Sequence, residues 1–124
     1  MNETLLYIGS IVIILWGIAH IIPTKVIVNG FGEIAEDNRK VLTMELIAEG
    51  LTLIFLGALP LLVTLLVGVQ DRTAGIVYIA CAVMLIVMAI LTSITGARTS
   101  TIWYKLCPAV KTVVAVLFIL SRIL

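Results

Sequence analysis

Four apolar runs, each long enough to cross a membrane, constrain the fold of this chain more than any other feature. They lie at about 4–22, 42–68, 74–97 and 101–122, and a hydrocarbon core about 30 Å thick requires about 20 apolar residues per helix. Hydrophobic residues make up 62% of the chain and charged residues 12%, which is too apolar for an ordinary globular domain. The sequence therefore predicts an all-α integral membrane four-helix bundle, a single transmembrane domain over residues 1–124.

Charge and the N-terminal sequence exclude two other interpretations. The formal net charge is only +1, whereas a nucleic-acid-binding protein carries a strong basic excess gathered in a patch. The first run, MNETLLYIGSIVIILWGIAHII, lacks the basic start and small-residue cleavage site of a signal peptide. We expect no nucleic-acid partner and expect the first run to be retained as a span.

The connections between the runs differ in length. The first, 23–41, contains NGFG, typical of a turn, and GEIAEDNRK, typical of a solvated or interfacial turn of helix. The connections 68–73 and 96–100 are short. Pro108 leaves two alternatives for the fourth span, because it either kinks a helix that begins near residue 101 or begins a shorter helix itself. We find no internal repeat, which argues against an inverted-repeat transporter within one chain.

An even number of spans places both termini on one side of the membrane. Connections 23–41 and 96–100 share the other side, here termed side A; the termini and connection 68–73 share side B. Side A carries Lys25, Arg39, Lys40 and Arg98, with Lys105 at its edge, and side B carries Arg72 and Arg122. The positive-inside rule predicts a multi-pass cell-membrane protein with side A in the cytoplasm and both termini outside.

Ionisable residues inside the spans gather in the side A half of the membrane. Glu45 and Glu49 are four apart on one helical face. Two close carboxylates in a low dielectric require a raised pKa or a cationic partner, and Lys111 lies at a suitable depth to pair with Glu49. His20 lies near the side A end of the first span. These four residues are the predicted ligand-binding site.

Two aromatic residues complete the predicted site. Trp16 lies one helical turn before His20, beside Gly17, which together with Gly9 allows another helix to approach closely. Tyr104 shares a helical face with Lys111. We expect a polar pocket that opens to side A, above a dry, aliphatic half on side B.

Each feature also has a purely structural interpretation. Glu45 is compatible with an interfacial carboxylate in the first turn of its helix, and Glu49 with Lys111 is compatible with an ion pair that only joins two helices. A single histidine beside lysines does not favour a metal site, so we expect none. Cys81 and Cys107 differ in depth by about 13 Å, too far for a disulfide, and we expect two buried thiols.

The segment 12–62 resembles DoxX-like small four-span membrane proteins. The resemblance rests on WGIAH at the end of the first span and ELIAEGLTLIFLGALPLL in the second. Because that group includes members linked to quinone and sulfur redox chemistry, the resemblance implies a quinone-like or other amphipathic ligand. The chain departs from the pattern in its EDNRK connection and in Lys111.

Three function classes remain open from the sequence. The first is a pocket for an amphipathic ligand, within an enzyme or a redox-associated subunit, in which His20 or Glu49 moves a proton. The second is a structural or accessory membrane subunit. The third is a proton- or ion-coupled transporter, which requires a homo-oligomer because one chain is small for a pathway. No nucleophile or metal set identifies an enzyme and no cofactor is indicated, so we favour the first class, with membrane lipid as the general partner.

Overall fold

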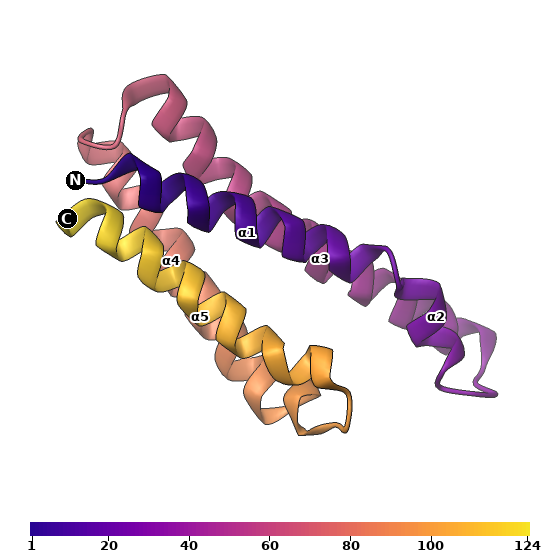
Figure 1. The fold of residues 1–124 in the computed structure, drawn as a ribbon. Coiled ribbons are helices and arrows are strands. Elements are labelled where there is room, and N and C mark those ends of the chain that lie inside the picture. The colour runs from indigo at the N-terminus through magenta and orange to yellow at the C-terminus, as the bar shows by residue number, and fades with distance from the viewer.

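The structure, a computed structural model that describes all residues 1–124, is an antiparallel bundle of four long helices (Figure 1). These are α1 (Glu3–Ile21), α3 (Glu36–Val67), α4 (Arg72–Ile94) and α5 (Ile102–Ile123). Helix α1 packs against α3 and α5, and α4 packs against the same two helices. All four are long and apolar enough to span a membrane. The predicted all-α membrane bundle is confirmed.

Two short elements connect the spans on side A. Helix α2 (Thr24–Asn29) follows α1 and packs against α3, and a 3₁₀ turn, η1 (Gly96–Arg98), joins α4 to α5. The N- and C-termini lie together at the opposite end of the bundle (Figure 1), where the backbone N–H of Asn2 donates to the carbonyl of Ser121 at 2.8 Å. The predicted pairing of the connections on side A and of the termini on side B therefore agrees with the fold.

Helix α3 begins six residues before the predicted boundary at residue 42. Its 32 residues extend about 48 Å, close to the thickness of a bilayer together with its headgroup layers. Glu36 and Asp37 occupy the first turn, where acidic side chains interact favourably with the helix dipole, and no glycine or proline follows before the apolar run. The charged segment, expected as a solvated or interfacial turn of helix, is thus continuous with the helix that forms the second span.

Helix α5 contains Pro108 in its interior, so the longer of the two alternatives for the fourth span is correct. The helix begins at Ile102, and Pro108 removes only the donor that the carbonyl of Tyr104 would otherwise accept from. The turns on either side keep their own hydrogen bonds. Lys111 consequently lies within a continuous helix that starts at side A.

Glycines allow α1 and α3 to pack with their backbones almost in contact. A Cβ atom on Gly17 would lie 2.7 Å from the carbonyl oxygen of Gly50, and one on Gly50 would lie 2.8 Å from that of Gly17. Gly9 in turn faces the ring of Phe118 on α5, 3.0 Å from where its Cβ would be. The predicted inward orientation of Gly9 and Gly17 is confirmed. The Gly17–Gly50 contact also places the neighbouring Glu49 and His20 at one level.

The side B half is less dry than predicted. Hydroxyl groups from four elements are buried there: Ser10, Thr64, Tyr78 and Ser121. The Thr64 hydroxyl contacts the Tyr78 hydroxyl and also bonds the Pro60 carbonyl at 2.7 Å. A threonine that bonds a carbonyl one turn back in its own helix is inexpensive to bury. The prediction of a dry side B half considered only charged residues and histidine, and so it did not include these four hydroxyl groups.

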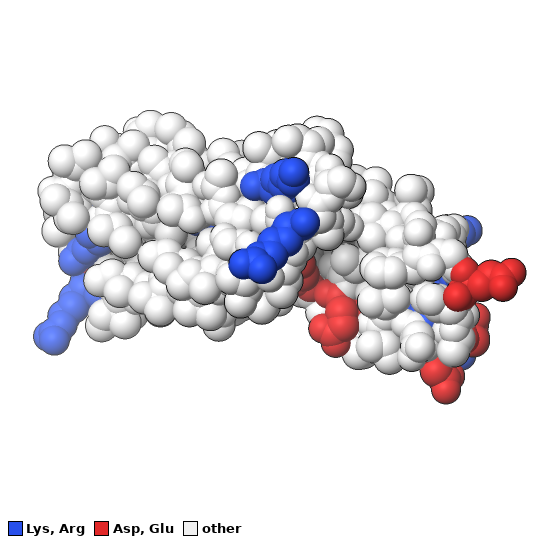
Figure 2. Space-filling view, turned by 90° about the horizontal axis from the view of Figure 1, so that it is seen from below, with Lys and Arg blue, Asp and Glu red and all other residues white.

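Arg122 closes the side B end of the bundle. Its Nη1 donates to the carbonyls of Val69 at 2.6 Å and Asp71 at 3.1 Å, and its guanidinium lies where a side chain on Gly75 would otherwise be. It thereby satisfies carbonyls in the turn between α3 and α4. In Figure 2, Lys and Arg side chains lie at one end and near the middle of the molecule with an uncharged stretch between them, and acidic side chains lie from the middle toward the other end.

Candidate functional site: an intramembrane charged cluster

The candidate site is centred on an ion pair between α3 and α5. Lys111 Nζ lies 2.7 Å from Glu49 Oε1 and donates a second hydrogen bond to the Thr92 hydroxyl of α4 at 2.8 Å. The predicted pairing of Glu49 with Lys111 is confirmed. The lysine side chain is fully buried, whereas the glutamate side chain is 34% exposed. One ammonium group thus connects three of the four spans.

His20 lies on the other side of Glu49. Its Nδ1 is 3.0 Å from the carbonyl of Trp16, and because a carbonyl only accepts, Nδ1 carries a proton. In the neutral ring Nε2 is then an acceptor, and the thiol of Cys107 approaches it at 3.5 Å. The same nitrogen is 3.8 Å from Glu49 Oε1. A protonated His20 would therefore form a second ion pair with the carboxylate.

The directions of the helices explain why these side chains meet. Side chains on a helix lean toward its N-terminus. Helices α3 and α5 run from side A to side B, so Glu49 and Lys111 lean toward side A, while α1 runs the other way and His20 leans back toward Trp16. The Lys111 ammonium consequently reaches Thr92, only one turn from the end of α4.

Trp16 lies beside the cluster, as predicted. Its ring packs edge-on against the His20 imidazole with centroids 6.0 Å apart and planes at 63°. The indole Nε1 is buried and has no hydrogen-bond partner. A buried N–H without an acceptor is uncommon in proteins, and the sulfur of Cys107 is placed to accept from this indole.

The other two predicted site residues lie outside this contact network. Glu45 is exposed and lies nine residues after the start of α3 at Glu36, so its interpretation as a first-turn carboxylate is wrong. Tyr104 is partly buried over Gly96, and its hydroxyl makes no hydrogen bond within the chain. Ser93 and Thr95, at the side A end of α4, bond carbonyls of their own helix.

Sequence reasoning missed two contacts of the cluster. Both cysteines are free and buried, as expected. The contact of Cys107 with His20 was not predicted, although its position one turn before Lys111 placed it on the same helical face. The Thr92 hydroxyl of α4 was not predicted as an acceptor for the lysine. No group of three histidine, cysteine, aspartate or glutamate side chains is arranged to hold a metal ion.

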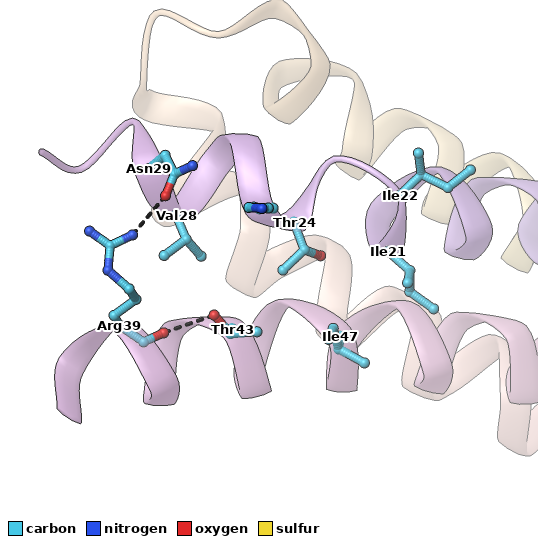
Figure 3. A pocket seen from close by; sticks show the side chains of 9 residues that line it. Ile21, Ile22, Thr24, Val28, Asn29, Arg39, Thr43 and Ile47 are labelled. Atoms are coloured by element: carbon cyan, nitrogen blue, oxygen red, sulfur yellow. Dashed lines mark hydrogen bonds between the residues drawn. The ribbon is translucent and has the colours of Figure 1, made fainter. Parts of the chain in front are cut away.

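A cavity of about 420 Å³ lies outside the cluster, between the end of α1, α2 and the first turns of α3 (Figure 3). None of the six predicted ligand-binding residues lines it. The cavity and the charged cluster are therefore separate features of the side A half.

Comparisons with known proteins do not assign a function to the chain. No family model, curated protein or solved structure matches the chain. What the fold establishes is a small four-span helical membrane protein with a buried Lys111–Glu49 pair.

Proposed function

We propose that this small membrane protein binds the polar head of an amphipathic, quinone-like ligand at the Glu49–Lys111 cluster. The observation that carries the proposal is the unequal burial of the pair: Lys111 is fully buried, and Glu49 is 34% exposed. Both Lys111 and His20 approach Oε1 of the carboxylate, and Oε2 has no partner within the chain. An intramembrane charge that stays open on one side is costly unless something else contacts it.

Access from the bilayer is consistent with the arrangement of the helices. The α1–α3 pair and the α4–α5 pair diverge toward side A (Figure 1). Acidic side chains emerge where the surface is recessed between the α4–α5 end and the protruding α2 end (Figure 2). A ligand in the side A leaflet would reach Glu49 laterally, without crossing the packed core.

The exposed acceptor of the cluster suits a ligand with a ring hydroxyl group. The Lys111 side chain is fully buried, whereas Glu49 is 34% exposed, so the carboxylate is the group of the pair that a ligand can contact. A ligand hydroxyl would donate to Glu49 Oε2, which makes no hydrogen bond within the chain. The resemblance of segment 12–62 to DoxX-like proteins supports the same ligand class.

Fluorescence quenching in lipid nanodiscs tests this proposal. A Trp103→Phe variant leaves Trp16 as the single tryptophan, and a short-chain naphthoquinone that carries a ring hydroxyl, the donor that Glu49 requires, should quench it saturably. Glu49→Gln should weaken binding about tenfold, because a charge-assisted hydrogen bond contributes about 1.5–3 kcal/mol. Glu45→Gln, on the same helix, is the matched control and should leave binding unchanged. Quenching that rises linearly without saturation, or equally in both variants, would contradict the proposal.

A structural role is the second candidate, because one lysine already joins α3, α4 and α5. In that case the pair only fixes how the helices dock. Replacing Glu49 and Lys111 together by Gln and Met would then leave all measurable properties except stability unchanged, including quinone quenching of Trp16.

A further inference from the structure

The cavity between α2 and α3 has one polar end and one apolar end. Arg39 and Asn29 close the end farthest from the bundle, and Ile21 and Ile47 line the end nearest the membrane spans (Figure 3). The Thr24 hydroxyl donates to the His20 carbonyl at the end of α1, and the Thr43 hydroxyl, which also lines the cavity, donates to the Arg39 carbonyl of its own helix. The remaining donors at this cavity therefore come from cationic and amide side chains.

Two cations line the cavity without a counter-ion. Lys25 and Arg39 both face it, and the only ion pairs in the structure are those of Glu49 with His20 and Lys111. Arg39 donates to the Asn29 side chain at 2.8 Å and to the Gly32 carbonyl at 3.3 Å. Since a guanidinium has five N–H donors, three remain free. Lys25 makes no hydrogen bond and is exposed.

The cavity lies at the depth of the membrane interface. It begins where α1 ends, and the 19 residues of α1 extend about 28 Å, close to the hydrocarbon thickness. Exposed apolar side chains lie beside the cavity: Ile22, which lines it, is 77% exposed and Val26 is 75% exposed, whereas Val28, which also lines it, is buried. Exposed isoleucine and valine beside cations are typical of a segment in contact with lipid headgroups and acyl chains.

We propose that this cavity binds an anionic phospholipid. The phosphate lies between Lys25 and Arg39, and the start of an acyl chain lies along Ile21 and Ile47. The polar end of the cavity lies away from the membrane spans and the apolar end lies next to them, which is the order of headgroup and acyl chain in a leaflet. The two cations supply the charge and the hydrogen bonds that a phosphate diester requires.

Native mass spectrometry of the full chain in mild detergent tests the site. Phosphatidylglycerol should bind about tenfold more tightly than phosphatidylcholine of the same chain length. Lys25→Gln and Arg39→Gln should each weaken phosphatidylglycerol binding about fivefold. Lys40→Gln is the matched control, because Lys40 is a neighbouring exposed cation of α3 that does not line the cavity. Lys25→Gln removes no contact within the protein, so it tests the charge even where Arg39→Gln disturbs α2.

Three results would overturn the proposal. Equal binding of the two lipids would show that the cations do not select an anion. An equal loss in Lys40→Gln would show that any surface cation suffices. Displacement of the lipid by millimolar inorganic phosphate, or equally tight binding of the deacylated headgroup, would show that a free phosphate compound is the occupant and that the apolar end is irrelevant.

Discussion

Replacing Glu49 with Gln should destabilise the bundle far more than the same change at Glu45. The amide keeps an acceptor for Lys111, but the fully buried ammonium loses its only counter-charge within hydrogen-bond distance. Removing one partner of a fully buried ion pair costs about 3–5 kcal/mol. Because Glu49 is one-third exposed, we expect a smaller loss of about 2–3 kcal/mol. Glu45 is exposed and unpaired, so its change should stay within about 0.5 kcal/mol.

A double-mutant cycle separates the ion pair from other effects of the substitution. Lys111→Met alone should cost less than Glu49→Gln, about 1–2 kcal/mol, because the exposed carboxylate can recruit other partners. The combined variant removes both charges and should be more stable than the sum of the two single effects predicts, by about 1–2 kcal/mol.

Reversible unfolding in mixed micelles, followed by circular dichroism, measures these free energies. Equal and negligible effects of Glu49→Gln and Glu45→Gln would refute the paired charge. Strictly additive single effects would refute the coupling between Glu49 and Lys111, even if each residue contributes to stability on its own.

The remaining predictions concern packing and topology. Gly50→Leu should destabilise the bundle by about 1–3 kcal/mol or more, because even its Cβ would collide with the Ile21 side chain and lie 2.8 Å from the carbonyl oxygen of Gly17; unfolding in micelles measures this, and unchanged stability would contradict the close α1–α3 contact. Thr64→Val should cost about 1 kcal/mol in the same assay, since it removes the partner of the Tyr78 hydroxyl; a neutral effect would count against that bond. A single cysteine at Glu33 should be labelled from the cytoplasm in intact cells, and labelling from outside would reverse the proposed orientation.

Much of the fold followed from the sequence because a membrane imposes few alternatives. Runs of about 20 apolar residues must be helices there, and depth along each run predicted that Glu49 would pair with Lys111. The small size of Gly9 and Gly17 predicted that another helix packs closely against this face of the first span. These features depend on local sequence and on one shared axis, the membrane normal.

The features that were missed depend on other information. The start of α3 at Glu36 depends on helix propensity and on the acidic residues of the first turn, outside the apolar run, which hydrophobicity does not report. The contact of Cys107 with His20 and the choice of Thr92 over its neighbours depend on how helices are rotated about their axes. The cavity between α2 and α3 forms because a short helix packs on α3. The sequence of this connection has too weak a helical pattern to predict that helix.

Photo-crosslinking with an azidoquinone tests the ligand proposal most directly. The protein in nanodiscs is illuminated with the probe, digested and analysed by mass spectrometry, with excess unmodified quinone as competitor. We predict adducts confined to the side A part of α1 around Trp16 and His20 and to α3 around Glu49, which the competitor removes and Glu49→Gln diminishes. Adducts scattered over the lipid-facing surfaces of all four spans, unaffected by the competitor, would contradict a site at this cluster.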